Sequence, residues 1–442
     1  MTEQQLLAPA DLAAIDLTDP RTFVGNDLSA LWRRFRDESP VHWHPAGART
    51  PGFWVVSKYA DSVAVYRDNK RFTSERGNVL ATLLQGEDSA SRKMLAVTDG
   101  ARHREIRNLM LKSFSPRVLA PIVDGIHRHT RELVARALAA GGRVDFVTDV
   151  ADHIPINTMG DLMAIPEADR EQLVEWNSLT LSRQSSDDSE MESLMARNEI
   201  LLYLSDLASE RRRNPGDDVI STLATAVVDG KPLTEDEIVF NCYSLILGGD
   251  ESTRMSTVGG LIALAEHPEQ WRRIKAGEVT VESATEEVLR WTTPAMHFGR
   301  RAMVDVPLRD QVIKAGDVVT LWNTSANFDE DVFDDPYAFD VGRTPNKHVV
   351  FGHGPHFCLG AFLGRVHVGA MVEALRATVA EVELTGPPQQ LYSNFVHGYS
   401  GLPVQLTAEP GTPVAAPATA TATATATQSQ ADTAQAAGTG RR

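Results

Sequence analysis

The chain has 442 residues, 42% of them hydrophobic, which is enough for a substantial core in one large domain or in several smaller ones. Its 43 basic and 59 acidic residues give a net charge of −16, which argues against a nucleic-acid partner because phosphate binding needs a basic surface. Two cysteines, Cys242 and Cys358, exclude a framework of several disulfides and suit a reducing cytoplasm.

The N-terminal segment has no basic region and no long apolar run, so we expect neither a signal peptide nor a membrane anchor, and a cytoplasmic protein. Residues 1–410 show no internal repeat and no break in composition, and we expect them to form a single domain. Beyond them the sequence becomes rich in Ala and Thr. Such a segment buries too little apolar surface to offset its ordering entropy, so we expect 411–442 to be a disordered tail.

The patterns of the domain predict a fold that is mainly α with small β-sheets. Short β-rich runs predict strands near its two ends, at 41–43, 53–57, 301–306, 312–313 and 318–322. Apolar residues at helical spacing predict long helices between them, including 101–113, 117–140 and 194–213.

The clearest helix is predicted over 234–267. Thr234 and Glu237 form a capping box at its start, and Pro268 stops it. About 33 residues at 1.5 Å each span roughly 50 Å, so we expect this helix to cross the whole domain.

The middle of this helix reads GGDEST, from Gly248 to Thr253. Two glycines inside a helix cost about 1 kcal/mol each relative to alanine, so something should compensate. One interpretation is a close helix crossing with a solvated charged patch. The other is a flat ligand lying against the glycines, with the acid and the hydroxyls forming a proton relay.

The stretch FGHGPHFCLG places Cys358 among glycines and histidines, directly before an apolar helical run. Glycine backbones can approach a large planar ligand, and a helix N-terminus favours a thiolate. Cys358 is therefore a candidate axial ligand of haem iron. Two other interpretations are a small buried hydrophobic residue and a zinc site with His353 and His356, which lacks an evident fourth ligand.

Charged residues at helical spacing form further candidate clusters. Glu287 and Arg290 lie three residues apart on one helical face, and Arg343 could join them in a buried cluster. His103 and Arg107 lie four apart, after a predicted cap at Asp99, and could bind an anion such as a carboxylate, or could belong to a solvated basic face. Two further candidates for anion binding, each weak alone, are Arg300 and His356.

Together these motifs resemble the cytochrome P-450 family of haem-thiolate monooxygenases. The cysteine loop resembles the family signature through Phe351, Gly352, Gly354, His356, Cys358 and Gly360. The Glu287–Arg290 pair and Arg343 are similar to the family's structural cluster, and the resemblance extends over about 15–405.

The resemblance implies the cytochrome P-450 fold, with haem b between two helices. It implies that Cys358 is the metal ligand on one face of the haem, and that the stretch with Gly249 covers the other face. Positions that hold the haem propionates in the family are matched by His103, Arg107, Arg300 and His356. The family's catalytic acid and threonine are matched by Glu251 and Ser252, with Thr253 as an alternative hydroxyl.

Two positions depart from the family pattern. Ser252 stands where threonine is usual, which keeps the hydroxyl but removes the methyl that restricts its rotamer. Gly364 stands where alanine is common.

The resemblance implies that O2 is activated with two electrons and that a mid-sized apolar metabolite is hydroxylated or epoxidised, in natural-product biosynthesis or in catabolism. The sequence has no dinucleotide fingerprint, so electrons should come from a ferredoxin and its reductase. Four basic residues could receive an acidic ferredoxin: Arg102, Arg104, Lys112 and Arg117. We expect a monomer with no nucleic-acid or membrane partner.

Family analogy places the substrate contacts in 79–84, 179–191, 293–298 and 393–402. Two alternatives remain for the function. One is oxidative coupling or ring formation without oxygen insertion, and the other is a haem-binding sensor without turnover. A substrate bound to a carrier protein is also compatible with the sequence.

Overall fold

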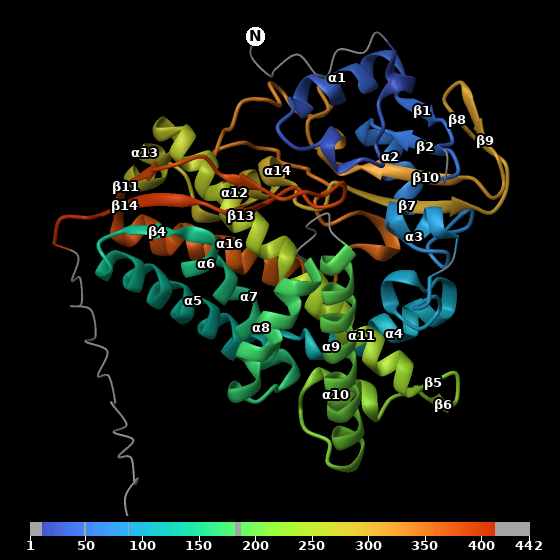
Figure 1. Cartoon of the computed structure of the whole chain (residues 1–442), viewed down its shortest axis with the longest axis horizontal. Helices are drawn as coiled ribbons and strands as arrows, with labels where there is room; N and C mark the ends of the chain where they lie inside the picture. Colours follow the sequence, from blue (N-terminus) through green and yellow to red (C-terminus); the bar gives the residue numbers. More distant parts are fainter. Residues whose placement is uncertain (1–10, 48–49, 87, 182–186, 412–442) are drawn as a thin grey trace, which may run out of the picture.

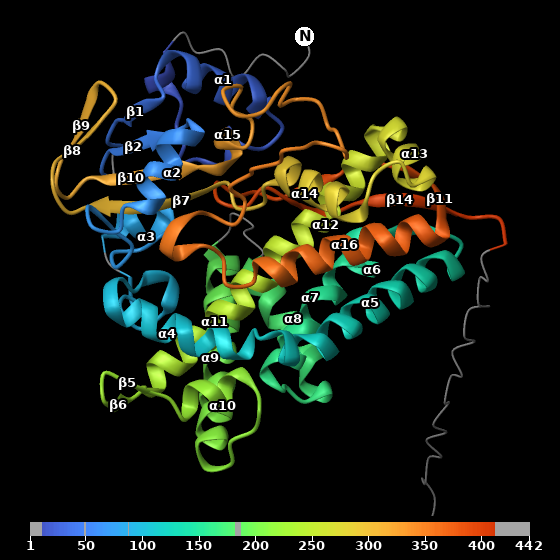
Figure 2. The same ribbon diagram turned by 180° about the vertical axis from the view of Figure 1, so that it is seen from behind.

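The computed structural model describes residues 11–47, 50–86, 88–181 and 187–411. A five-stranded sheet and the first two helices lie at one side of the molecule, and most of the helices lie at the other (Figures 1 and 2). The expected tail falls at 412–442, outside the described residues. In the part of the chain that is described, no helix is both long and apolar enough to cross a bilayer.

The five-stranded sheet has the order β1-β2-β10-β7-β3. Its strands are β1 (Val41–His44), β2 (Phe53–Val56), β10 (Val318–Trp322), β7 (His297–Ala302) and β3 (Phe72–Thr73). β2 pairs antiparallel with β1 and parallel with β10, which joins the beginning of the domain to its C-terminal third. The predicted strands at 41–43, 53–57 and 318–322 are confirmed.

The prediction of one strand over 301–306 is wrong. β7 ends at Ala302, and a separate hairpin of β8 (Val306–Leu308) and β9 (Gln311–Ile313) follows. One more backbone contact, from the N–H of Met303 to the carbonyl of Arg71 at 2.8 Å, continues the pairing with β3. The chain then enters the hairpin, whose two strands pair with each other instead of with the sheet.

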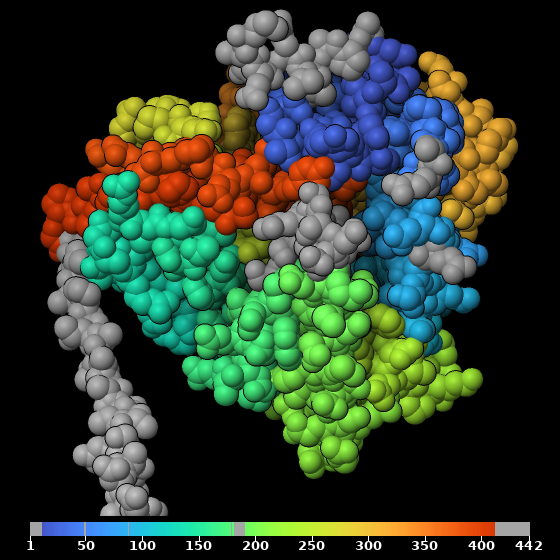
Figure 3. Space-filling view, in the orientation of Figure 1, coloured from blue at the N-terminus to red at the C-terminus, as the bar shows by residue number. Residues whose placement is uncertain are grey.

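The remaining strands form three small units. β4 (Arg143–Asp145) pairs with β14 (Pro403–Ala408), which pairs with β11 (Val379–Leu384). Two short hairpins are β5 (Val227–Val228) with β6 (Lys231–Pro232), and β12 (Gln389–Gln390) with β13 (Tyr399–Gly401). The space-filling view shows the red C-terminal strands as a band between α13 and the teal α5–α6 region (Figure 3).

Helices make up most of the remaining described chain, apart from loops such as the long segment between α15 and α16. In the first half they are α1 (Leu28–Glu38), α2 (Tyr59–Arg67), α3 (Leu80–Gln85), α4 (Gly100–Ser113), α5 (Pro116–Ala139), α6 (Phe146–Asp149), α7 (Ile154–Met163), α8 (Glu167–Leu181) and α9 (Asp187–Arg213). In the second half they are α10 (Val219–Ala224), α11 (Glu235–Gly249), α12 (Glu251–Glu266), α13 (Pro268–Ala276), α14 (Val281–Thr292), α15 (Asn323–Ala326) and α16 (Ala361–Thr378). The predicted helices at 101–113, 117–140 and 194–213 correspond to α4, α5 and the greater part of α9.

The prediction of one continuous helix over 234–267 is wrong, because α11 ends at Gly249 and α12 begins at Glu251. The capping box is confirmed: Thr234 and Glu237 each accept a backbone N–H from the other. At Asp250 the ψ angle reaches −71°, away from the helical value. Within the same turn, the Ser252 hydroxyl donates to the Gly248 carbonyl at 2.8 Å, a contact that often bends helices.

Two apolar clusters hold the helices together. One joins residues of α4, α5, α7, α9 and α11 to the start of α16, and the other joins α5, α12, α14 and α16 to β11 and β14. The helix that follows Cys358 packs against α5 and α12, and it shares an apolar cluster with residues of α11.

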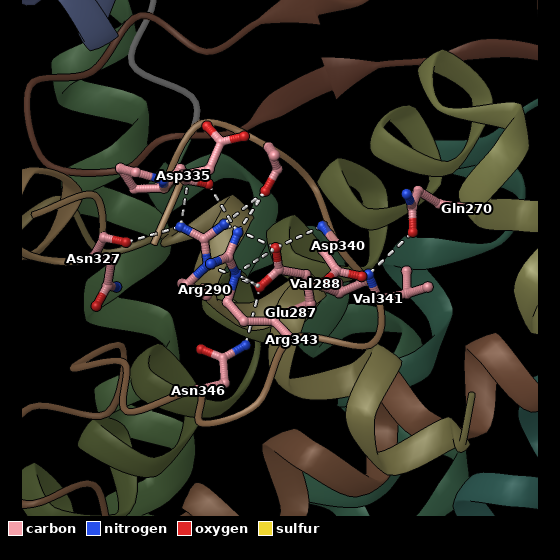
Figure 4. A network of polar contacts seen from close by, with 12 residues as sticks. Gln270, Glu287, Val288, Arg290, Asn327, Asp335, Asp340, Val341, Arg343 and Asn346 are labelled. Atoms are coloured by element: carbon pink, nitrogen blue, oxygen red, sulfur yellow. Dashed lines mark hydrogen bonds and ion pairs between the residues drawn. The ribbon is translucent and has the colours of Figure 1, made fainter. Parts of the chain in front are cut away.

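A buried ion cluster fixes the segment that leads to Cys358 (Figure 4). Glu287 and Arg290 are fully buried and form a two-bond ion pair on α14, with both N···O distances 2.8 Å. Arg343 approaches Glu287 at 3.2 Å, which confirms the predicted three-residue cluster. Arg290 also donates to the carbonyls of Asn327 and Pro336 at 2.9 Å.

Replacing Glu287 by alanine should leave two buried guanidinium groups without their carboxylate. We expect the free energy of unfolding to fall by about 3–5 kcal/mol. Urea unfolding followed by circular dichroism measures the change. The control is Glu282→Ala on the same helix, because Glu282 is exposed and its loss should cost about 0.5 kcal/mol at most. Equal effects of the two substitutions would contradict a structural role of the cluster.

Candidate active site

The Cys358 loop is held by backbone contacts that only glycine permits. Gly352 and Gly354 have φ angles of 66° and 71°. A Cβ atom at Gly354 would lie 2.6 Å from the carbonyl oxygen of Tyr66, so the loop can press against α2 only without a side chain there. The N–H of Cys358 donates to the Phe351 carbonyl at 2.9 Å, which closes the loop.

Cys358 lies just before α16, with Gly360 as the N-cap residue. Burial raises the pKa of its thiol, whereas a backbone N–H of Gly360 and the charges of Arg107 and Arg365 act in the opposite direction. These donors and cations favour a sulfur that carries negative charge. A Cβ atom at Gly360 would meet no atom within 4 Å, so open space adjoins the loop at this glycine.

The alternative interpretations of the loop have less support. Within the described ranges, no group of three His, Cys, Asp or Glu side chains could hold a metal ion, which removes the zinc site with His353 and His356. Cys242 is the ordinary buried cysteine of the chain, because it lies in the apolar cluster of α11 and burial strongly raises its pKa.

The structure brings His103 and His356 together: their ring centroids lie 4.3 Å apart. His103 Nε2 is buried and has no hydrogen-bond partner. Burial, together with the charges of His356 and Arg107, lowers the pKa of His103 to about 4. His356 Nε2 contacts Asp99 at 2.8 Å.

The two arginines of the predicted set lie on the same part of the fold. Arg107 is held toward the cysteine loop, since its Nη2 donates to the Phe357 carbonyl at 2.7 Å. Arg300 on β7 is buried and donates to the carbonyl of Gly299 at 2.7 Å, and burial lowers its pKa. Buried cationic groups and an unpartnered imidazole nitrogen fit a ligand with carboxylates, so the residues present suit the propionates of haem.

The predicted cap of α4 at Asp99 is confirmed in position, although its side chain makes no capping hydrogen bond. Asp99 occupies the N-cap position, but its carboxylate accepts from the Thr73 hydroxyl at 2.7 Å and from the Ser74 N–H at 2.8 Å. The carboxylate thus ties β3 to His356 instead of binding the first turn of its own helix.

The two glycines of the interrupted helix have different surroundings. A Cβ atom at Gly249 would lie 2.9 Å from the side chain of Met159, so the packing of α7 explains the missing side chain there. A Cβ atom at Gly248 would meet nothing within 4 Å. Gly248 is therefore the glycine of the pair that adjoins open space, and the haem contact expected of Gly249 stays a prediction.

The predicted relay residues Glu251, Ser252 and Thr253 form the first turn of α12. Glu251 and Ser252 are half-buried and Thr253 is buried. The Ser252 hydroxyl is engaged by the Gly248 carbonyl, as described above, and its place at the helix break gives it a defined position. The proton-transfer role of the three residues stays a prediction.

Sequence reasoning missed two features of this site. Arg365 forms a bidentate ion pair with Glu286, with N···O distances of 2.6 and 3.0 Å, and its guanidinium lies 4.5 Å from the centre of the Phe351 ring. Asp250 is buried and accepts a hydrogen bond from Asn177 of α8. Arg365 follows Cys358 by seven residues, and this spacing could have indicated it from the sequence. No local pattern indicated Asn177.

Burial raises the pKa of Asp250 from 3.8 to about 6. The folded chain therefore binds a proton that the unfolded chain releases between about pH 4 and pH 6, and stability is lost as the pH rises through this window. Asp250→Asn does not titrate. We expect the melting temperature of Asp250→Asn, relative to that of the wild type, to be higher by about 2 °C or more at pH 7.0 than at pH 4.5.

The control for this experiment is Asp236→Asn, since Asp236 is an exposed carboxylate at the start of α11. Its melting temperature should follow the wild type at both pH values. If the melting temperatures of Asp250→Asn and the wild type differed by the same amount at both pH values, the raised pKa of Asp250 would be contradicted.

A cysteine in a glycine loop, a helix break packed near α16 and a cationic cradle for carboxylates together define a haem-thiolate protein. The family model for cytochrome P-450 matches residues 48–377, and the chain belongs to that family. Relatives in this family are named as monooxygenases, so the protein is an oxidoreductase that incorporates oxygen from O2.

Among curated relatives, the chain is 44% identical to the cytochrome P-450 NovI of Streptomyces niveus over 407 residues, covering 92% of this chain and all of that one. It is 31% identical to the steroid C26-monooxygenase of Mycobacterium tuberculosis (strain ATCC 25618 / H37Rv), over 89% of this chain and 92% of the relative.

Two solved structures are similar at a TM-score of 0.82 and over 90% of this chain and 100% of each structure. One is the P-450 OxyD, involved in the biosynthesis of vancomycin-type antibiotics, at 32% identity. The other is CYP268A2 of Mycobacterium marinum in complex with pseudoionone, at 34% identity. The expected fold is thereby confirmed.

Proposed function

We propose that this protein is a cytoplasmic monooxygenase of natural-product biosynthesis that uses haem b, O2 and two electrons from a ferredoxin and its reductase. The substrate is a mid-sized apolar metabolite, which the enzyme hydroxylates or epoxidises. The observation that carries the proposal is the Cys358 loop beside the cationic cradle. Support for the role in biosynthesis comes from the similarity to OxyD, which is involved in making vancomycin-type antibiotics.

Each of the candidate residues would have its own role in binding the haem. Cys358 would bind the iron, and Phe351 and Gly360 would pack beside the haem. The propionates would be held by His103, Arg107, Arg300 and His356. When bound, the haem supplies the activation of O2, and the thiolate ligand favours O–O cleavage.

The first turn of α12, which carries Glu251, Ser252 and Thr253, would deliver protons to the site. Glu251 would take up and release a proton at its carboxyl group, and Ser252, the next residue in the chain, would pass it toward the oxygen side of the site. Thr253 is an alternative hydroxyl. The Ser252 hydroxyl is positioned for this task by its hydrogen bond to Gly248.

Replacing Cys358 by alanine should abolish the thiolate type of ferrous carbonyl spectrum, because no other described cysteine lies near the loop. The matched control is Cys242→Ala, whose spectrum should equal that of the wild type since Cys242 lies in the core of α11. Survival of the thiolate spectrum in Cys358→Ala would remove the basis of the proposal.

Ser252→Ala should divert electrons from product to hydrogen peroxide. We expect product formed per NADH to fall by about tenfold or more, and Ser252→Thr to restore it. The control is Ser256→Ala, because the Ser256 hydroxyl makes the same kind of contact, 2.8 Å to the Ser252 carbonyl, one turn further along. Unchanged coupling in Ser252→Ala would assign the relay to Thr253 or to water.

The surface proposed for ferredoxin needs one correction. Arg102 forms ion pairs with Asp229 and Glu237, so its charge is largely neutralised within the protein. Three basic residues of the expected set remain exposed: Arg104, Lys112 and Arg117. Arg104 and Lys112 lie on α4 and Arg117 lies on α5. The side chains of Leu111 on α4 and Phe357 in the cysteine loop are also exposed, and Arg107 links α4 to that loop.

Charge reversal at Arg104 and Lys112 should slow reduction by an acidic ferredoxin by about tenfold at low ionic strength, with a smaller effect at high salt. Stopped-flow reduction of the ferric enzyme measures the rate. Arg272→Glu on α13 is the control, since Arg272 is exposed and lies on a different element. Equal rates for the double variant and the wild type would move the docking surface elsewhere.

The substrate class is tested by a ligand screen that follows the optical shift of the haem, and then by product mass. A gain of one oxygen atom supports hydroxylation or epoxidation. A loss of two hydrogens instead identifies oxidative coupling or ring formation, and an optical shift with neither product nor ligand-dependent NADH consumption is the outcome for a sensor.

A further inference from the structure

Asp250 interrupts the long helix and is the centre of a polar cluster formed by Asn177, Asp250, Arg254 and Asp152, which we term the Asp250 cluster. Asn177 on α8 donates through Nδ2 to the Asp250 carboxylate. Arg254 on α12 forms an ion pair of 2.7 Å with Asp152, which lies before α7. The cluster therefore joins three separate segments at the break between α11 and α12.

The Asp250 cluster contains two buried polar atoms without a hydrogen-bond partner, Asn177 Oδ1 and Arg254 Nε. Asn177 is only 2% exposed and Asp250 is 8% exposed, so solvent gives little compensation. A carboxylate can only accept hydrogen bonds, whereas a protonated carboxyl group also donates one. A proton on Asp250 would thus provide the donor that Asn177 Oδ1 lacks.

The position of Asp250 connects this cluster to the relay turn. Gly248 lies two residues before it and Ser252 two residues after it, and the Ser252 hydroxyl donates to the Gly248 carbonyl across the break. The backbone of Asp250 also takes part in both helices, because its N–H donates to Ile246 and its carbonyl accepts from Arg254, both at 3.0 Å. A displacement of Asp250 must therefore alter the Ser252–Gly248 contact.

We propose that Asp250 is a positioning residue: when protonated, it pairs with the Asn177 amide through two hydrogen bonds, fixes α8 on the helix break and keeps Ser252 in its relay position. The inference rests on the proposed relay function of Ser252. Loss of the proton leaves a single hydrogen bond and a buried negative charge, and the contact between α8 and the break loosens.

The charged groups around Asp250 oppose one another. The net effect is a pKa of about 6 for Asp250: burial is the largest cause, the charge of Asp152 acts in the same direction, and the charge of Arg254 and the hydrogen bond from Asn177 act in the opposite direction. Glu251 is the adjacent residue in the chain and interacts with Arg254. The group that faces Asp250 from α8 is Asn177, which is neutral. From α7, the uncharged side chain of Met159 lies against the neighbouring Gly249.

The test uses the haem-loaded full-length enzyme and two substitutions. Asp250→Asn carries a permanent donor and no charge, so it imitates the protonated state at every pH. Asn177→Ala removes the partner on α8. The control is Asp236→Asn, an exposed carboxylate on α11.

Hydrogen exchange, expressed as protection factors to correct for the intrinsic pH dependence, reports on α8 and on 246–254 without turnover. In the wild type we expect protection to be about tenfold higher at pH 5.5 than at pH 7.5. Asp250→Asn should show the high value at both pH values, Asn177→Ala the low value at both, and Asp236→Asn should follow the wild type. A pH dependence in Asp250→Asn equal to that of the wild type would overturn the proposal.

Coupling of NADH to product gives the second readout. The change in product formed per NADH between pH 5.5 and pH 7.5 should be several-fold smaller in Asp250→Asn than in the wild type. If Ser252→Ala leaves coupling unchanged, the relay fails, and the exchange experiment alone then decides whether Asp250 fixes α8. If exchange is unaltered in both variants, Asp250 has no positioning role even when Ser252 does act as the relay.

Discussion

The ion cluster of Glu287, Arg290 and Arg343 is the constraint on which the rest of the structure depends. A fully buried guanidinium group is tolerated only when every donor has an acceptor, and Arg290 finds its acceptors on α14 and on backbone carbonyls between Asn327 and Ala338. Glu287 in turn accepts from the backbone of Asp340 at 2.9 Å. An irregular segment of the chain is thereby folded around two charges, and the loop that carries Cys358 begins directly after it.

From this anchor the site is assembled by contacts between distant segments. The cysteine loop presses on α2, Arg107 reaches it from α4, and His356 is tied through Asp99 to β3. These contacts bring Arg107 and His356 beside His103, whose Nε2 is buried without a hydrogen-bond partner. A ligand that bears carboxylates and a metal cation supplies the missing partners, which connects the fold to the chemistry of the family.

Local signals in the sequence were sufficient for the capping box at Thr234, for the Glu287–Arg290 pair and for the cysteine loop, since each depends on neighbours within a few residues. They were insufficient where a distant residue decides the outcome. The helix break at Asp250 involves Asn177, 73 positions away, and the charge of Arg102 is met by Asp229, 127 positions away. Spacing along the chain carries no information about such partners.

Gly364 has a consequence for how this enzyme can be compared with its relatives. A Cβ atom there would lie 3.3 Å from the edge of the Phe351 ring, which is tighter than an ordinary side-chain contact. The ring is also confined by Arg365 on its face and by Phe357, whose ring centre lies 6.2 Å away. An alanine at position 364, the residue common in the family, would therefore require the Phe351 ring to move by a few tenths of an ångström. The orientation of this ring beside the cysteine loop is thus coupled to the side chain at position 364.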